Sequence, residues 1–197
     1  MEKTILAPGI ILYKTSKDEI KDIFNMVEPT IRDRWQKAMG VNTDTLENEV
    51  VQSRKCYDFP LSNNNLDDSM NNLYDVVDSW IGSRVQDFVN HYAIEKLDKG
   101  PYIFLKYNQT DKFDWHIDDG NKFPRTVSVS AYLNDEYEGG EIEFQHYGIS
   151  HKPEAGDIIV FGSSFSYLHR VKPVSEGTRY AIVNWYRYNG YPVMMGE

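Results

Sequence analysis

The apolar positions in the first half of the chain have the period of α-helices. A capping box formed by Ser16 and Glu19 marks the start of a first helix, and Pro29 is expected to end it. A second, shorter helix is predicted over residues 31–39, with its end at Gly40. The first helix is expected to bury the face whose residues recur at i, i+3, i+4 and i+7, namely Ile20, Ile23, Phe24 and Val27.

A longer helix is predicted to begin at about Asp67. Its apolar residues follow a period close to that of an α-helix and form one stripe: Leu73, Val76, Val77, Trp80, Ile81, Phe88 and Tyr92. Residues 41–66, which precede it, show little pattern except at 49–51 and 54–59, where an edge strand is expected. The first half is therefore predicted to be helical, with a long polar connection before the last helix.

After Gly100 the pattern changes to short alternating segments separated by turns. Residues 168–174 and 179–188 are expected to close the sheet as a pair joined by 175–177, and residues 135–140 to form a turn. The other predicted strands cover residues 102–107, 126–133, 141–144 and 158–161. This pattern is typical of an antiparallel sandwich or barrel.

The strand over 126–133 has two chemically different faces. One face is apolar and consists of Val127, Val129, Ala131 and Leu133. The other consists of Thr126, Ser128, Ser130 and Tyr132. Small hydroxyl side chains beside one tyrosine suit the wall of a polar cavity better than a packed core. We therefore expect a site on this face of the strand.

The length and composition fit one globular domain. A chain of 197 residues with 41% hydrophobic and 26% charged residues is long enough for one complete core, and a second independent domain is not expected. We predict a single domain over 1–197, in which residues 1–99 are a helical support and residues 100–190 form the β core. A net charge of −9 disfavours a nucleic-acid partner, because phosphate binding relies on clustered Lys and Arg.

Three features of the sequence predict a cytoplasmic protein. No run of eighteen apolar residues indicates a membrane span. Pro8 and Gly9 interrupt the apolar stretch near the N-terminus, which lacks the basic start of a signal peptide. Cys56 is the only cysteine, so an internal disulfide is excluded and a reducing compartment fits.

The main chemical candidate is the pair His116 and Asp118, which lies at the end of a predicted strand. Residues i and i+2 of a strand point to the same face, so an imidazole and a carboxylate can aim at one point. With a distant second histidine, His169, they would make the facial triad of non-haem iron enzymes. The pair alone also fits a structural strand histidine beside a turn-capping aspartate, because short motifs often occur by chance.

Arg179 is the second candidate. Alternation places it on the same strand face as Ala181, Val183 and Trp185, which indicates a dry environment. A buried guanidinium needs an anion, and its planar fork matches a carboxylate. Both a ligand carboxylate and a structural salt bridge to one of the 30 acidic residues satisfy this requirement.

Five groups of residues, taken in order, extend these candidates to a family resemblance. They are Leu105-Lys106-Tyr107 with His116-Ile117-Asp118; Tyr132-Leu133-Asn134 with Glu138-Gly139-Gly140-Glu141 and Phe144; Ala155-Gly156-Asp157 with Phe161; His169-Arg170-Val171-Lys172-Pro173-Val174 with Gly177-Thr178-Arg179; and Arg179-Tyr180-Ala181 with Trp185. Together they resemble the Fe(II)/2-oxoglutarate-dependent dioxygenases, specifically the prolyl 4-hydroxylase-like branch. The resemblance covers roughly residues 100–188.

The resemblance implies an α+β fold whose core is a double-stranded β-helix, or jelly roll, of mostly antiparallel strands with N-terminal helices packed against one sheet. It implies that iron is bound by His116, Asp118 and His169. It also implies that 2-oxoglutarate is bound by Arg179, Tyr132 and Tyr107. Fe(II), 2-oxoglutarate and O₂ would be required, with ascorbate as a candidate reductant. The implied reaction hydroxylates a C–H bond, with a peptidyl residue such as proline as the expected substrate, and gives succinate and CO₂.

Two departures from the family pattern affect these expectations. Thr110 stands where many members have glycine before the first ligand, which puts the loop conformation in doubt. The clamp is Arg179, whereas collagen-type enzymes have lysine, so a collagen-like substrate does not follow. Residues 41–66 are the expected substrate loop, because they are long, polar and poorly patterned.

Two other functions remain open at this point. The same core also occurs in oxidative demethylases of nucleic acid, although the acidic charge and the lack of a second clamp arginine argue against this activity. A jelly-roll module that holds metal without turnover would also retain the three ligands.

Overall fold

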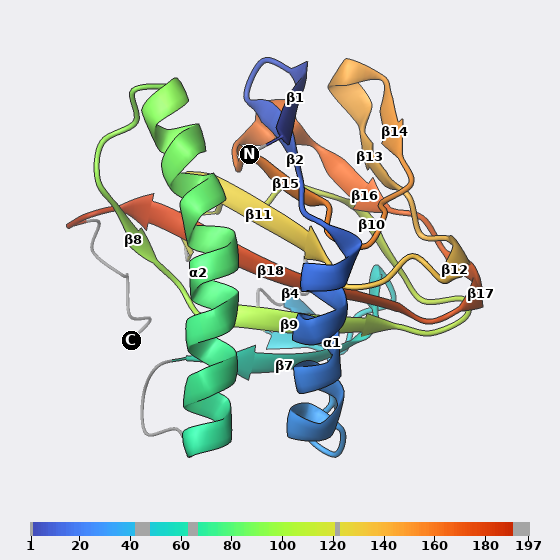
Figure 1. Cartoon of the computed structure of the whole chain (residues 1–197). Helices are drawn as coiled ribbons and strands as arrows, with labels where there is room; N and C mark the ends of the chain where they lie inside the picture. Colours follow the sequence, from blue (N-terminus) through green and yellow to red (C-terminus); the bar gives the residue numbers. More distant parts are fainter. Residues whose placement is uncertain (1, 42–47, 63–66, 121–122, 191–197) are drawn as a thin grey trace.

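Two helices lie side by side over one face of a large antiparallel sheet (Figure 1). They are α1 (Lys17–Ile31) and α2 (Asp68–His91). The structure is a computed structural model and describes residues 2–41, 48–62, 67–120 and 123–190. Neither helix combines the length and apolar character that a membrane crossing requires.

The large sheet places the N-terminal strands beside strands from the second half of the chain. Its order is β1 (Glu2–Ala7), β2 (Ile10–Lys14), β15 (Ile158–Gly162), β11 (Val127–Tyr132), β18 (Arg179–Tyr188), β9 (Tyr102–Tyr107), β7 (Tyr57–Leu61) and β3 (Gln36–Lys37), with β8 (Leu97–Lys99) also paired to β18. All pairs in this sheet are antiparallel. The central strands β11 and β18 are therefore flanked on both sides, and their residues lie deep in the molecule.

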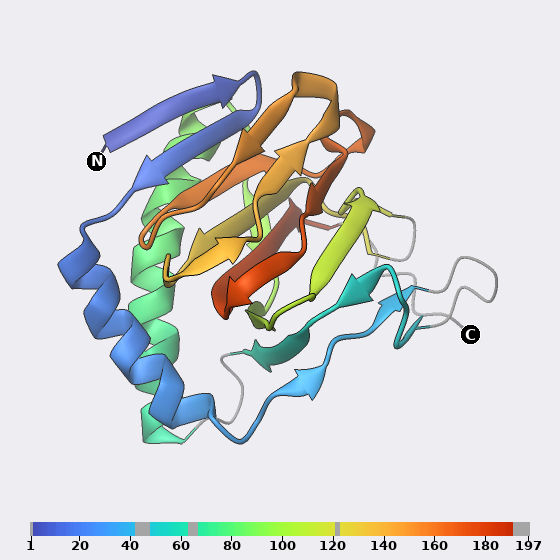
Figure 2. The same cartoon turned by 90° about the vertical axis from the view of Figure 1, so that its right-hand side faces the viewer.

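A smaller sheet faces the large one on the side away from the helices (Figures 1 and 2). Its order is β14 (Ile149–His151), β13 (Ile142–Phe144), β16 (His169–Val171), β10 (Lys112–His116) and β6 (Arg54–Lys55). Two separate ribbons pair β12 (Tyr137–Gly139) with β17 (Val174–Gly177) and β4 (Gly40–Val41) with β5 (Asn48–Glu49). Short 3-10 helices cover Gln145–Tyr147 and Phe165–Tyr167. Two facing antiparallel sheets with helices on one outer side confirm the predicted jelly roll.

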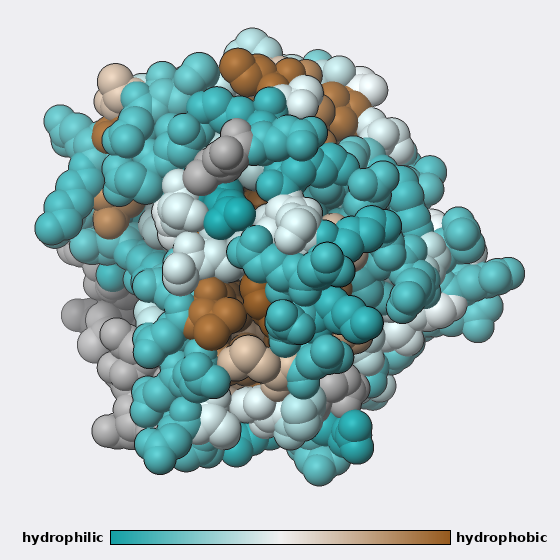
Figure 3. Space-filling view, in the orientation of Figure 1, coloured by the Kyte–Doolittle hydropathy of each residue, from teal (hydrophilic) through white to brown (hydrophobic). Residues whose placement is uncertain are grey.

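Strand β11 separates two apolar clusters. Val127, Val129 and Ala131 face the cluster between the large sheet and the helices, where Leu73 and Trp80 of α2 are also buried. The alternate residues face the space between the two sheets, as the sequence predicted. Figure 3 shows further apolar surface in a hollow between α1 and α2.

The first helix starts as predicted but continues past its proline. The Ser16 hydroxyl caps it by accepting a hydrogen bond from the backbone N–H of Glu19. Pro29 lies inside the last turn, so the prediction that it ends the helix is wrong. A proline costs least where few intrahelical bonds remain to be broken. The Thr30 hydroxyl donates to the carbonyl oxygen of Met26 at 2.7 Å, which gives that end of the helix a further contact.

The prediction of a helix over residues 31–39 is also wrong. This segment contains the short outer strand β3, and the backbone N–H of Ala38 donates to the carbonyl of Cys56. The edge strand predicted over 54–59 is divided between the two sheets: β6 lies at an edge of the smaller sheet, whereas β7 is covered by β3. Residues 42–47 and 63–66 of the predicted substrate loop lie outside the described residues.

The prediction that residues 168–174 and 179–188 pair with each other is wrong. Strand β16 pairs with β10 and β13, while β18 pairs with β11 and β9. The segments predicted as turns at 135–140 and 175–177 contain β12 and part of β17, which pair with each other. The hairpin of β1 and β2 was not predicted.

Candidate metal centre and anion pocket

His116, Asp118 and His169 come together at the open end of the two sheets. Each offers one ligand atom, and these atoms all lie within 4.8 Å of one another. Nε2 of His116 is 3.8 Å from Oδ1 of Asp118, and Nε2 of His169 is 3.8 Å from Oδ2. The two histidines are cross-strand partners on β10 and β16, so the register of the smaller sheet fixes their separation.

Hydrogen bonds determine which nitrogen of each imidazole is free. Nδ1 of His116 is 2.7 Å from the carbonyl oxygen of Asp114, and Nδ1 of His169 is 2.9 Å from that of Tyr167. A carbonyl only accepts, so each Nδ1 carries a proton and donates it. Each Nε2 then has a free lone pair, which is the state that binds a metal. The ring of Phe113 stacks on His116 with a centroid distance of 3.5 Å.

The charge states of His116 and Asp118 also suit metal binding. Burial, followed by repulsion from His169, lowers the pKa of His116 to about 3, so its imidazole is neutral at neutral pH. Burial opposes ionisation of Asp118, but His169, His116 and Arg125 together lower its pKa to about 2. The site therefore presents a neutral imidazole and a carboxylate anion from these two residues.

Asp118 is held by two side chains that the sequence did not connect to it. The Ser128 hydroxyl donates to Oδ2 at 2.7 Å. Nη1 of Arg125 donates to the backbone carbonyl of Asp118 at 3.2 Å, and its guanidinium carbon lies 3.8 Å from the centroid of the Trp185 ring. The polar face of the predicted strand was the sequence signal for Ser128, but its partner, Asp118, lies in a separate segment that the fold brings next to β11.

Arg179 is buried without a carboxylate partner. Its side chain is among the largest that are fully buried, and its Nε and Nη1 atoms have no hydrogen-bond partner. Among the described residues no acidic group lies within ion-pair distance of it. The guanidinium carbon lies 4.8 Å from the ring centroid of Tyr107 and 4.9 Å from that of Tyr132. The Tyr132 hydroxyl is also buried and unpartnered. A buried cation with unpaired donors requires an anion, and these side chains do not supply one.

One cavity connects the triad with Arg179. It has a volume of about 920 Å³ and is lined by strands of both sheets, including His116, Asp118, His169, Arg179 and Tyr107. Tyr132 lies behind Arg179, against its guanidinium. The structure thus brings together all six residues that the sequence analysis selected. A buried cation and three potential metal ligands therefore line the same cavity.

The mouth of this cavity is apolar. Four of the large hydrophobic side chains that remain exposed line it: Met39, Trp115, Ile117 and Phe123. Phe113 and Trp115 flank His116, and Trp115 is 39% exposed, with the Arg170 guanidinium over its ring. Exposed apolar groups gathered at one site mark a place where another molecule binds.

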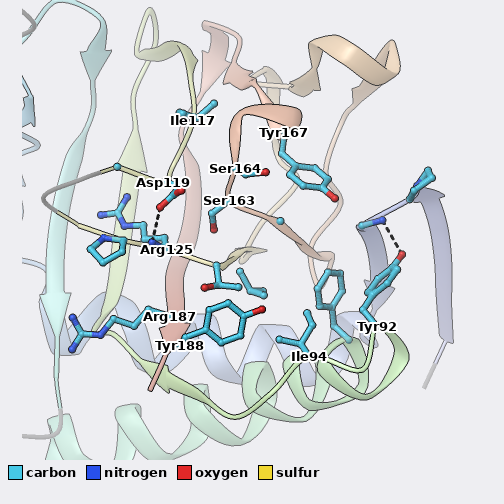
Figure 4. Close-up of a pocket in the computed structure, with 18 residues that line it drawn as sticks. Tyr92, Ile94, Ile117, Asp119, Arg125, Ser163, Ser164, Tyr167, Arg187 and Tyr188 are labelled. Carbon is cyan, nitrogen blue, oxygen red and sulfur yellow. Dashed lines mark hydrogen bonds between the residues drawn. The ribbon is translucent and has the colours of Figure 1, made fainter. Parts of the chain in front are cut away.

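A second cavity of about 1140 Å³ adjoins the first across the loop that follows His116. The two share four lining residues: Ile117, Asp119, Gly120 and Arg125. Figure 4 shows Ser163, Ser164 and Tyr167 on its wall, with Tyr188 and Ile94 from other parts of the fold. None of the residues selected from the sequence as metal or co-substrate ligands lines this second cavity.

The remaining histidines and the cysteine lie outside the triad. His146 is exposed, whereas His151 is partly buried and its Nε2 lies 2.8 Å from the Asp157 carboxylate. His91 ends α2 and packs edge-on against Tyr92. Cys56 is buried, and burial raises the pKa of its thiol, so it lacks the features of a reactive cysteine.

Comparison with known families identifies the segment that carries the site. Residues 102–187 match the family model of the 2OG-Fe(II) oxygenase superfamily. A PKHD-type hydroxylase of Cupriavidus pinatubonensis is 35% identical over 97 residues, which is 43% of this chain and 42% of the relative. The chain therefore spans less than half the length of the curated relatives that it matches.

Solved structures with the same fold cover nearly the whole chain. A prolyl-4-hydroxylase of Pseudomonas putida superposes with a TM-score of 0.67 at 20% identity and covers 91% of this chain and 93% of its own. A prolyl hydroxylase of Trichoplax adhaerens, solved with a peptide fragment of hypoxia inducible factor, gives a TM-score of 0.69 at 18% identity over 90% of this chain and 83% of its own. At these identities the similarity shows the fold alone.

Proposed function

We propose that the protein is an Fe(II)- and 2-oxoglutarate-dependent dioxygenase that hydroxylates a C–H bond, and the match of residues 102–187 to the family model of the 2OG-Fe(II) oxygenase superfamily supports this proposal. The observation that carries the proposal is one cavity lined by both the ligand triad and the unpaired Arg179. A metal site alone would not need a buried guanidinium, and a structural arginine would have its own carboxylate.

The donor set fits Fe(II). Two neutral imidazoles and one carboxylate are the facial triad of non-haem iron oxygenases, and three ligands on one side leave further positions for co-substrate and O₂. His116, Asp118 and His169 would hold the ion. Their hydrogen bonds to backbone carbonyls and to Ser128 already orient them. A preformed site of this kind loses little entropy when the metal binds.

The buried polar atoms fit 2-oxoglutarate. Arg179 would bind the distal carboxylate through its unpaired nitrogens, which match a carboxylate in a planar fork. The Tyr132 hydroxyl, which also lacks a partner, would donate to the same ligand. Tyr107 lines the cavity on the other side of the guanidinium and would make a further contact. The bound anion would satisfy groups that are costly to bury alone.

When bound, iron and 2-oxoglutarate supply oxidative decarboxylation, in which one oxygen atom of O₂ enters succinate, CO₂ leaves, and the other oxygen atom hydroxylates the substrate carbon. The protein's own residues bind, orient and keep water away. Phe113, Ile142 and Phe161 line the cavity beside the triad and provide its dry wall. Ascorbate would serve only to return the iron to its ferrous state.

The proposed substrate is a polypeptide segment, with a proline as the target residue. The apolar mouth formed by Met39, Trp115, Ile117 and Phe123 supports this choice, because such a surface favours an uncharged chain over a phosphate backbone. The net charge of −9 points the same way. The names of the structural relatives, which include prolyl hydroxylases, are consistent with it.

We also propose that residues 1–197 work as one unit in the cytoplasm. The helices cover the large sheet that carries Arg179 and Tyr132, so the first half supports the second. A buried thiol as the sole cysteine suits a reducing compartment.

The test is an anaerobic titration with Fe(II) and then 2-oxoglutarate, followed through the visible metal-to-ligand charge-transfer band. We expect a band that requires both additions and that disappears in His116→Ala, while the control His146→Ala, which removes an exposed histidine, keeps it. Iron binding without a band, and no succinate on admission of O₂, would instead show a metal-holding module. Absence of iron binding would overturn the site.

A further inference from the structure

Two buried serine hydroxyls extend from Asp118 into the large sheet. Ser128 is completely buried at the centre of β11, and Ser163, which follows β15, is 1% exposed. Their hydroxyl oxygens are 2.8 Å apart, and that of Ser128 is 2.7 Å from Oδ2 of Asp118. The three side chains form an unbroken line of hydrogen bonds.

Chemistry fixes the direction of this line. An ionised carboxylate only accepts hydrogen bonds, so the single proton of Ser128 must point to Asp118. The Ser128 oxygen is then free to accept, and Ser163 must be the donor to it. The Asp118 carboxylate polarises the Ser128 hydroxyl, which makes its oxygen a better acceptor for Ser163. Such polarisation strengthens a chain of hydrogen bonds in a dry interior.

The backbone around Ser163 holds the same loop in place. The carbonyl of Ser163 accepts from the N–H of Asp119 at 3.0 Å, and the N–H of Ser163 donates to the carbonyl of Thr126 at 3.1 Å. Oδ1 of Asp119 in turn accepts from the N–H of Arg125 at 3.0 Å. Figure 4 shows Ser163 beside Asp119 on the wall of the second cavity, with the Asp119–Arg125 hydrogen bond marked. Ser163 thus links the rigid sheet to the loop that carries Asp118.

We propose that Ser128 and Ser163 are positioning residues for the metal centre, and that their directed hydroxyl chain keeps Asp118 a one-oxygen ligand. The hydrogen bond from Ser128 to Oδ2 makes the two carboxylate oxygens unequal and opposes rotation of the carboxylate. This restraint would keep open a coordination position that the co-substrate needs. The inference rests on the proposed function, because it assumes that the triad binds metal.

The experiment uses Co(II), which reports coordination number through its visible absorption, and needs no turnover. Loss of an outer hydrogen bond to a ligand typically weakens metal binding by about 10- to 100-fold. We expect Ser128→Ala to raise the Kd for Co(II) by at least about 10-fold and to change the Co(II) absorption spectrum. We expect Ser163→Ala to change the Kd and the spectrum in the same direction but by less, because the Ser128 hydroxyl still donates to Asp118.

Two variants provide matched comparisons. Ser164→Ala removes the neighbouring hydroxyl on the wall of the same cavity, which makes no capping hydrogen bond, and should match the wild type. Ser128→Thr keeps the donor at the same position and should restore the wild-type Co(II) spectrum. Circular dichroism checks that each variant is folded, and if Ser128→Ala does not fold, Ser163→Ala and Ser128→Thr decide the matter.

The outcomes separate this inference from the proposed function. A Ser128→Ala protein with the Kd and spectrum of Ser164→Ala would overturn the role of Ser128 while the metal site stands. Wild-type values in Ser163→Ala would overturn the two-hydroxyl chain. If the wild type itself bound no Co(II), the proposed function would fail first, and this inference with it.

Discussion

The guanidinium of Arg179 and the phenol of Tyr132 lie against each other, 4.9 Å from carbon to ring centroid, and both keep buried polar atoms without a partner. The two residues come from adjacent strands of the large sheet, since Tyr132 is the cross-strand neighbour of Ala181. The pKa of Arg179 stays raised despite its burial, because Tyr132, Tyr137 and Tyr107 surround it. The pair therefore holds unpaired polar atoms at a buried cation, and Arg179 lines the cavity of the triad.

Substitution of Arg179 tests this relationship. Removing one partner of a buried charged hydrogen bond costs about 2–5 kcal/mol, which is roughly a 30-fold or larger loss of affinity. We expect Arg179→Ala to raise the Kd for 2-oxoglutarate by at least that factor, measured by anaerobic titration of the Fe(II)-loaded protein. Arg179→Lys keeps the positive charge but loses the planar guanidinium. Its Kd for 2-oxoglutarate should lie between those of the wild type and Arg179→Ala. Arg84→Ala on α2 is the control, and equal affinities in all four proteins would refute the clamp.

Gly140 makes room for Arg179. It has a φ of +67°, and an added Cβ would lie 3.0 Å from Cδ of Arg179 and 3.1 Å from the Tyr137 ring. Gly148 has a similar φ of +62° with open space around it. We expect Gly148→Ala to lower the free energy of unfolding by about 1 kcal/mol through backbone strain alone. Gly140→Ala should cost more and should also weaken 2-oxoglutarate binding. Similar losses in both, with unchanged binding, would show that the crowding is relieved elsewhere.

Thr110 occupies a position at which many members of the family are expected to have glycine, and its backbone conformation is strained. Its φ is +72°, a region that costs a β-branched residue about 1–2 kcal/mol. Its hydroxyl accepts a hydrogen bond from Nζ of Lys55, so substitution removes that contact as well. The informative comparison is therefore between Thr110→Gly and Thr110→Ala. We expect the glycine variant to be the more stable by about 1 kcal/mol in urea unfolding, and the reverse order would show that the strain is absent.

Asp157 makes stability depend on acid pH. Its side chain is 1% exposed; burial raises its pKa, but His151, the N–H of Glu154 and Lys14 outweigh that effect and lower it overall. Because the folded pKa lies below the unfolded value of about 3.9, the stabilisation is complete above pH 4 and disappears as the pH falls through the folded pKa.

Substitution by asparagine measures this contribution. We expect Asp157→Asn to lower the free energy of unfolding by about 2 kcal/mol at pH 7, and the difference from the wild type to shrink as the pH falls below 4. Asp75→Asn, on the exposed face of α2, should show no such trend. A difference that is constant with pH would mean that the Asp157 charge does not contribute.

The sequence predicted the elements whose pattern is local. The cap at Ser16, the stripe of α2 and the two faces of β11 all depend on residues a few positions apart. It also selected the six residues that the fold gathers around one cavity, because the H-x-D pair, the second histidine and the arginine follow one another in a recognisable order.

The features that it missed depend on distant partners. Strand β3 looked helical because its outer position beside β7 is decided by a pairing about 20 residues away, between Gln36 and Asp58. The wrong pairing of β16 arose because neighbouring strands in sequence were assumed to be neighbours in the sheet, which jelly-roll crossovers violate. The contact between Ser128 and Asp118 is of the same kind, since it depends on how a loop returns to the sheet.

The β1–β2 hairpin has a consequence for self-association. The apolar strand β2, with Ile10 to Tyr13 all buried, would be the outermost strand of the large sheet without β1. An open, apolar strand of that kind is a template for pairing with the sheet of another copy. β1 takes that outer place, and although its Ile5 is exposed, its Glu2 and Lys3 put charged side chains at the new edge. By covering the edge of β2, the first strand therefore protects the large sheet from edge-to-edge pairing with another copy.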